Sequence, residues 1–160
     1  MPLHTGLVFA LAFGIGVVAG LRSLTAPAAV SWGARLGWLD LQDSSLAFMG
    51  STVAVMIFSL LAVAEYVADL LPTTPRRTTP GPLIARIVMG GLSGACLCAS
   101  ASQPVSIGAV LGGMGGLIGA FAGYQARTRL VKALGVKDRT IALSEDVVTI
   151  GLAWFLVSWR

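Results

Sequence analysis

Four acidic side chains have the types and spacing of a cation or proton site. Glu65 and Asp69 are four residues apart, so a helix would place them on one face. Glu145 and Asp146 are adjacent, about 100° apart around a helix, so at most one of them can face a shared site fully. The spacing predicts an ion site at these four acids, with Glu65 and Glu145 as the favoured ligands.

Basic side chains offer the opposite charge. Arg22 stands beside hydroxyl residues, where it would bind an anionic group or a phosphate, or simply extend to lipid headgroups. Arg86 is expected to form a structural pair with the acids, and Arg76 and Arg77 are further candidates. The pattern therefore fits a structural salt-bridge cluster as well as it fits a functional ion site.

Catalytic and metal-binding patterns are missing from the sequence. His4 is the sole histidine, and there is no Ser-His-Asp set, zinc-ligand spacing, phosphate loop or dinucleotide-binding glycine pattern. Cys96 and Cys98 are two apart in an apolar stretch and are expected to pack as small residues. We therefore expect no enzyme, no catalytic residue, no metal and no cofactor.

The segments that carry these residues are too apolar for a water-soluble fold. Of the 160 residues, 56% are hydrophobic and 11% are charged, whereas soluble domains carry about 25% charged residues. The forty residues between Arg86 and Arg127 contain no charged side chain, and only residues 101–104 break the apolar run. Since a span needs about 20 residues, this length predicts two spans joined by a tight turn. The sequence predicts an all-α, polytopic helical membrane protein, with residues 1–160 as one integral membrane domain.

Five stretches are long and apolar enough to be read as spans: residues 5–21, 44–71, 83–101, 105–124 and 141–159. Residues 26–36 include Pro27, and we predict a short re-entrant or interfacial helix there. Residues 127–139 are amphipathic and basic, and they are expected to extend the fourth span. Intramembrane acids often mark ion paths, so the four acids near the span ends are candidates for a cation or proton site.

The basic residues predict an orientation. Eight of the eleven Lys and Arg residues flank the connections after the second and fourth spans. Such loops stay in the cytoplasm, so we expect a cytoplasmic N-terminus, the four acids on the same side, and Arg22 at the opposite mouth. Two similar segments, 20–40 and 123–138, also suggest an inverted repeat, which is a common plan of transporters.

Glycines on the fourth span form two rows with a spacing of four: Gly108, Gly112 and Gly116 in one, and Gly115, Gly119 and Gly123 in the other. Such a glycine zipper lets helix backbones approach closely on two faces, so this span should be central. We also expect a homo-oligomer, with a dimer favoured, that packs through the glycine rows.

Three motifs resemble a known family. They are Gly20-Leu21-Arg22 followed by Pro27, Glu65-x-x-Ala68-Asp69-x-x-Pro72, and Ala142-Leu143-Ser144-Glu145-Asp146-Val147. Together they are similar to the bacterial multi-pass family known as domain of unknown function 4126, over most of the chain. The resemblance implies a small integral membrane protein without an established activity, and we expect it in the bacterial cytoplasmic (inner) membrane. The positions that match the family's motifs are Arg22, Glu65, Asp69, Pro72, Glu145 and Asp146.

Two functions stay open. The first is a small membrane transporter or channel, cation- or proton-linked, for a small ion or solute. The second is a non-transporting scaffold or lipid-binding protein, with Arg127, Arg129 and Lys132 holding lipid headgroups. A wet cavity that reaches Glu65 would favour transport, whereas a dry pair of Arg86 and Glu65 would favour the scaffold. Membrane lipids are expected partners in both cases, and nucleic acid is not, because span orientation already explains the basic residues.

Overall fold

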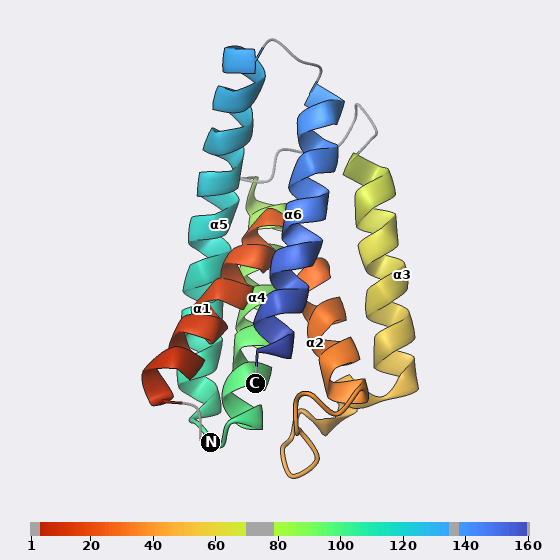
Figure 1. Cartoon of the computed structure of the whole chain (residues 1–160), viewed down its shortest axis with the longest axis vertical. Coiled ribbons are helices and arrows are strands. Elements are labelled where there is room, and N and C mark those ends of the chain that lie inside the picture. The colour runs from red at the N-terminus through yellow and green to blue at the C-terminus, as the bar shows by residue number, and fades with distance from the viewer. Residues whose placement is uncertain (1–3, 70–78, 135–137, 160) are drawn as a thin grey trace.

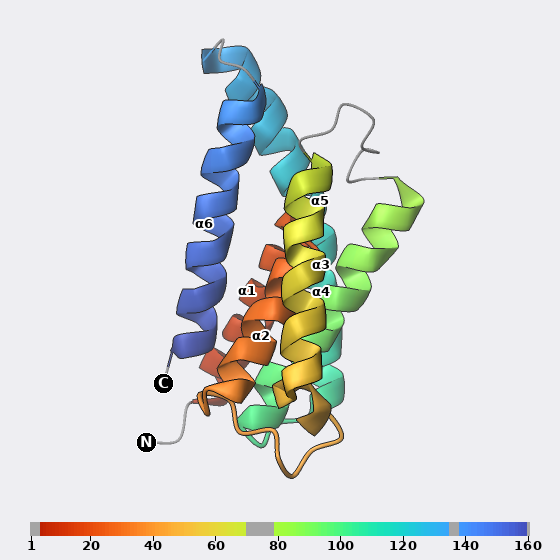
Figure 2. The ribbon, with the colours of Figure 1, turned by 90° about the vertical axis from the view of Figure 1, so that its right-hand side faces the viewer.

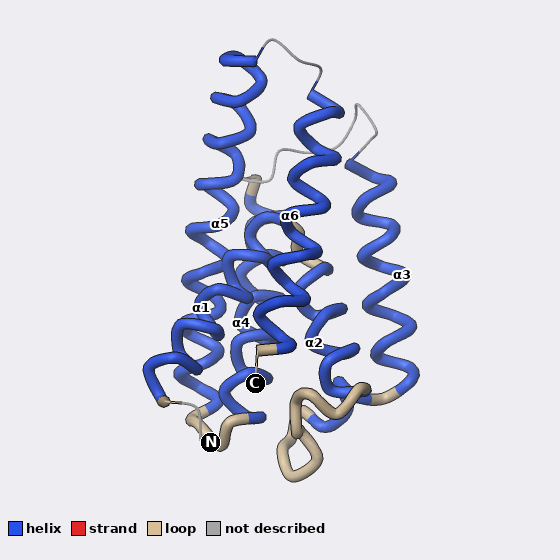
Figure 3. Tube along the Cα trace, in the orientation of Figure 1, coloured by secondary structure: helices blue, strands red, loops and turns tan. Residues whose placement is uncertain are grey.

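The computed structural model describes residues 4–69, 79–134 and 138–159, leaving out the side chains of 134 and 138–142. Throughout these ranges the regular structure is helical, without strands (Figure 3), which confirms the predicted all-α class. The elements follow one another as α1 (Thr5–Leu21), α2 (Thr25–Arg35), the 3-10 helix η1 (Ala47–Gly50), α3 (Thr52–Asp69), α4 (Pro80–Ser100), α5 (Val105–Leu134) and α6 (Asp138–Ser158).

Several of these helices suit a lipid environment. Three are long and apolar enough to cross a bilayer, namely α3, α4 and the Val105–Ala133 part of α5. The shorter apolar helix α1 has 17 residues, which rise about 26 Å against a hydrocarbon thickness of about 30 Å. The chain is thus a polytopic helical membrane protein, while the total of five spans stays a prediction.

The centre of the bundle is α5, which packs against α4 with one glycine row and against α1 with the other. A Cβ atom on Gly112 would overlap the carbonyl oxygen of Gly90 in α4, and one on Gly119 would overlap the carbonyl oxygen of Val17 in α1. Main chains can approach this closely only where side chains are missing. Both rows are filled by helices of the same chain, so the subunit interface expected at these glycines is wrong.

The direction of the helices follows from these contacts. Gly115 lies against Phe13 and Gly119 against Val17, so α1 and α5 run parallel, and α4 packs against both in the opposite direction (Figure 1). The start of α1 therefore lies at the opposite end of the bundle from the end of α5. The expected pairing of the N-terminus with the basic connections on one side is wrong. The inverted repeat is also wrong, because it needs α1 and α5 to run in opposite directions.

The cause of both corrections is α2. After α1 ends, the chain turns over residues 22–24 and α2 runs back inside the bundle, between α6 and α3 (Figure 2). Ala26, Val30 and Ser31 of α2 are completely buried. The segment predicted at 26–36 is thus a helix that re-enters the bundle and does not lie across its end. It reverses the chain once more than a count of five spans allows.

Local sequence explains where the helices begin and end. Pro27 is the third residue of α2, where its missing N–H removes no helix bond. Gly37 follows α2 with φ +78°, and its N–H donates to the Ala34 carbonyl, 3.3 Å away, as a glycine C-cap does. The tight turn predicted at 101–104 is confirmed, with Gln103 N donating to the Cys98 carbonyl at 2.8 Å.

Two predicted boundaries differ from the structure. The second predicted span, 44–71, begins later, because the Oγ atom of Ser51 accepts a bond from Ala54 N at 3.1 Å and caps α3 there. The fourth span continues into the basic segment as predicted, as far as Leu134. Several expected residues lie outside the described part of the chain or have side chains left out: Pro72, Arg76, Arg77, Lys137 and Arg139.

Candidate functional site

The end of α1 is capped by an arginine from α4. Arg86 donates from Nη1 to the carbonyl oxygens of Gly20 and Leu21, at 2.8 and 2.9 Å. The last carbonyls of a helix lack helical partners and carry a partial negative charge. Arg86 is 4% exposed, so its positive charge acts there largely out of contact with solvent.

The start of α2 is capped by a carboxylate from α3. Glu65 accepts bonds from Ser23 N and Leu24 N, both at 2.9 Å, and from Ser23 Oγ at 2.7 Å. Amides at a helix start carry a partial positive charge, which a carboxylate stabilises. Glu65 Oε1 also lies 3.7 Å from Arg86 Nη2. The side chains that cap the end of α1 and the start of α2 therefore form an ion pair with each other.

Arg22 lies at the tip of the turn and holds two further acids. It is 1% exposed and is the largest fully buried side chain among the described residues. Its Nε donates to Asp146 Oδ1 at 2.8 Å, while Nη2 pairs with Asp146 and Nη1 pairs with Asp69. The planar guanidinium suits such forked pairing. Arg22 thus joins the end of α1 to both α3 and α6.

This position corrects the expectation for Arg22. The sequence placed it at the mouth opposite the acids, or reaching toward outer headgroups. Because α2 returns through the bundle, the end of α1 lies at the level of the last residue of α3, Asp69, and of Asp146, more than two turns inside α6. Arg22 is therefore buried among the acids, and it does not extend to headgroups.

The two adjacent acids of α6 face different partners, as their angular separation requires. Asp146 faces Arg22, while Glu145 Oε2 lies 3.9 Å from Arg127 Nη1 on α5. The sequence favoured Glu145 over Asp146 as a ligand beside Glu65, whereas the structure brings Asp146 to the turn. Arg129 and Lys132, the other two lipid-headgroup candidates, are exposed near the end of α5.

Sequence reasoning missed Tyr66. Its ring lies beneath the guanidinium of Arg22, with the Cζ atom 4.9 Å from the ring centroid, which is a cation–π geometry. Its hydroxyl is 2.7 Å from Thr25 Oγ1 on α2. Tyr66 is three residues before Asp69, so it shares that helix face, but only the depth of α2 shows that this face meets Arg22.

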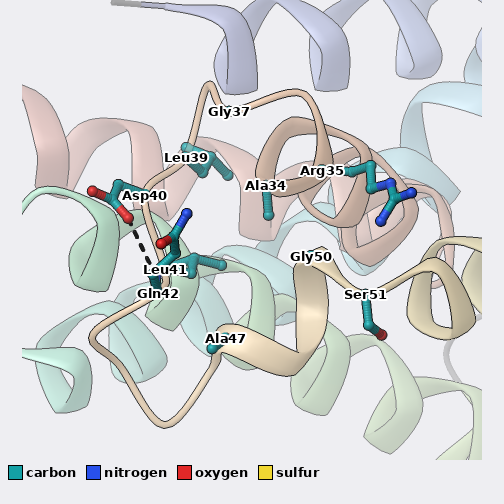
Figure 4. Close-up of a pocket in the computed structure, with 10 residues that line it drawn as sticks. All are labelled: Ala34, Arg35, Gly37, Leu39, Asp40, Leu41, Gln42, Ala47, Gly50 and Ser51. Atoms are coloured by element: carbon teal, nitrogen blue, oxygen red, sulfur yellow. Dashed lines mark hydrogen bonds between the residues drawn. The ribbon is translucent and has the colours of Figure 1, made fainter.

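Two recesses lie along α2 or at its far end, and Glu65 lines neither of them. A recess of about 600 Å³ lies at the far end of α2, where Arg35 and Asp40 stand on opposite sides (Figure 4). Gln42 N donates to Asp40 Oδ1 there, at 3.2 Å. The second recess is a groove of about 250 Å³ along α2, bordered by α3 and α6.

Fold and site together define a small polytopic helical membrane protein in which the turn between two antiparallel helices, α1 and α2, is surrounded by ion pairs. The chain belongs to the family described as "Domain of unknown function (DUF4126)", which matches residues 9–159. The resemblance drawn from three motifs is confirmed. Searches of curated proteins and of solved structures found no match. Four of the six motif positions take part in the ion pairs around the turn, namely Arg22, Glu65, Asp69 and Asp146, and a fifth, Glu145, pairs with Arg127.

Proposed function

We propose that the protein is a small proton- or cation-linked membrane transporter, without enzymatic activity. The observation that carries this proposal is the buried Arg22, which pairs with acids on two helices outside the three-helix core. α1, α4 and α5 are fixed together by main-chain contacts at glycines. By contrast, α3 packs on α2 and η1, and α6 packs on α2 with smaller contacts to α1 and α5. Ion pairs therefore tie the peripheral helices to the core.

The meeting of two helix ends at one turn supports transport over a simple pore. In many secondary transporters, helix ends inside the protein form the substrate and ion sites. Here the two helix ends meet Glu65 and Arg86, whose charges occupy the places that ionic substrate groups take in such proteins. At the glycines of the described core, the direct backbone contacts of α1, α4 and α5 leave no room for a water molecule between these helices.

A proton or a cation would change the strength of these ties. An arginine stays charged in proteins, whereas an aspartate that binds a proton loses the charge that attracts the guanidinium. Protonation of Asp146 or Asp69 therefore weakens its bond to Arg22, and a bound cation competes for the same oxygens. Ion binding is thereby linked to the release of α6 or α3, as a coupled equilibrium requires.

The alternative is a non-transporting scaffold or lipid-binding protein. The close pair of Arg86 and Glu65 supports it. The exposed Arg129 and Lys132 would then hold anionic lipid at the membrane surface. Under this alternative, neutralising Arg127, Arg129 and Lys132 abolishes lipid retention, and no solute moves.

The basic end of the bundle also supports an orientation. Positively charged connections stay in the cytoplasm, so we place the end of α5 on the cytoplasmic side of a bacterial inner membrane. Because α1 runs parallel to α5, the N-terminus then faces outward, in place of the cytoplasmic N-terminus that five spans predicted. A homo-oligomer, with a dimer favoured, stays part of the proposal and would use surfaces other than the glycine rows.

Proton flux into liposomes that hold a pH-sensitive dye tests the proposal. We expect the wild-type protein to dissipate an imposed gradient, and Asp146→Asn and Asp69→Asn to change the rate by about tenfold, the effect of about 1.4 kcal/mol. Asp43→Asn, in the exposed loop at the other end, is the matched control and should behave like wild type. Wild-type rates in both Arg22-partner variants would refute the ion-pair mechanism. A wild type that moves no ion but retains lipid would establish the scaffold instead.

A further inference from the structure

The groove along α2 has a mostly apolar wall. It is bordered by small side chains from three helices and by two indoles: Ala28, Ala29, Ala62, Ala153, Trp32 and Trp154. The indole N–H of Trp32 already donates to Ser59 Oγ at 3.0 Å. The groove runs between α6 and α3, which stand on either side of α2 (Figure 2).

The surroundings of this groove are hydrocarbon. α3 is one of the helices apolar and long enough to span the bilayer, and its outer side chains are open, with Leu60 67% and Val63 59% exposed. Water in an apolar groove at this depth would lack hydrogen-bond partners. A hydrocarbon chain of the bilayer therefore suits this groove better than water does.

One end of the groove is shared with the ion-pair cluster. Thr25 and Tyr66 line that end, and their hydroxyls are 2.7 Å apart. The ring of Tyr66 also stacks against the guanidinium of Arg22, whose Cζ atom lies 4.9 Å from the ring centroid. A single aromatic ring therefore separates the apolar groove from the charged turn, and a molecule that spans both must be an amphiphile.

We propose that the groove takes one acyl chain of a bilayer lipid, and that the transported substrate is a lipid-like amphiphile that enters sideways between α3 and α6. The choice of substrate rests on the proposed transport function, whereas the binding of the chain does not. The polar part of the amphiphile lies toward Thr25 and Tyr66. Its arrival moves the ring on which Arg22 is stacked, which joins substrate entry to the ion pairs that hold α3 and α6.

Native mass spectrometry of the purified protein with added dioleoylphosphatidylcholine tests chain binding. This lipid has no net charge, so the basic residues near the end of α5 do not drive its retention. We expect one lipid to be retained by the wild type. Ala28→Phe fills the groove, and displacing even two methylene groups lowers the affinity about tenfold. Val63→Phe adds the same ring on the outer surface of α3 and is the matched control.

Each outcome decides the inference. Loss of the lipid in Ala28→Phe with retention in Val63→Phe supports the acyl-chain site, while equal retention or equal loss in the two variants overturns it. If circular dichroism shows that Ala28→Phe does not fold, the smaller filling variant Ala29→Leu decides in its place. A wild type that carries protons but retains no lipid defeats this inference alone. A groove-specific lipid on a protein that moves no ion defeats the transport proposal alone.

Discussion

Glu65 and Arg86 lie 3.7 Å apart and cap the two helix ends that meet at a single turn. Arg86 bonds to the last carbonyls of α1, and Glu65 bonds to the first amides of α2. Inside a membrane these backbone groups have no water to bond with, so side chains must satisfy them. Side chains of α3 and α4 thereby stabilise the turn between α1 and α2, which come before them in the chain.

Replacement of Glu65 should destabilise the turn in proportion to the bonds lost. Glu65→Ala leaves the amides of Ser23 and Leu24 without their acceptor, at about 1–3 kcal/mol for each buried group. Glu65→Gln keeps one acceptor oxygen and should lose less than Glu65→Ala does. Thermal unfolding of the detergent-solubilised variants measures the difference, with Asp43→Ala as an exposed acidic control. Equal losses for the alanine and glutamine variants would show that the cap is not what stabilises the turn.

Replacement of Arg22 should lower the stability of the protein more than replacement of Glu65 does. A second substitution should recover part of that stability. Arg22→Gln leaves the partly buried carboxylates of Asp69 and Asp146 without their guanidinium, and the loss should approach the roughly 3–5 kcal/mol typical of a broken buried pair. The double variant Arg22→Gln with Asp146→Asn removes one stranded charge and should unfold at a higher temperature than Arg22→Gln alone. If the double variant is no more stable, the pair between Arg22 and Asp146 contributes little to the fold.

Hydropathy and glycine spacing predicted much of this structure. The bounds of α1, the turn at 101–104 and the extension of α5 follow from apolar runs and turn residues, which are local signals. The depth of α2 does not follow from them. Its eleven residues include Trp32 and Arg35, which also suit a helix lying at the membrane surface. Only packing against α3, α4 and α6 decides that it re-enters, and this one choice sets the direction of every later helix.

The parts of the site were predicted, and so was the pair of Arg86 with Glu65, but the partners of Arg22 were not. Motif spacing selected Arg22 and the four acids, and helix geometry required Glu145 and Asp146 to face different ways. The partner of each acid depends on which helix ends share a level in the bundle. An error in the depth of α2 therefore moved Arg22 to the wrong end, and it hid the contact with Tyr66.

The glycine contacts of α5 should tolerate no added methyl group. A Cβ atom on Gly112 would overlap the carbonyl of Gly90 in α4, and overpacking of this kind costs about 1–3 kcal/mol. Gly151 on α6 has no atom within 4 Å of a built Cβ, so Gly151→Ala should be neutral or slightly stabilising, as alanine favours helices. Unfolding temperatures of Gly112→Ala and Gly151→Ala measured side by side check this. A stable Gly112→Ala protein would contradict the close packing of α4 and α5.

The parallel course of α1 and α5 predicts that their like ends are reached from the same side of the membrane. A cysteine placed at His4 and one placed at Lys132 should therefore react with an impermeant maleimide from opposite sides of sealed vesicles. Cys96 and Cys98 are buried, so the native background is low. Asp40→Cys, in the loop after α2, is the matched control and should be labelled from the same side as His4→Cys. Labelling of His4→Cys and Lys132→Cys from one side would mean that α2 does not reverse the chain. Arg22 would then be unable to reach Asp69 and Asp146, and the proposed coupling would fail with it.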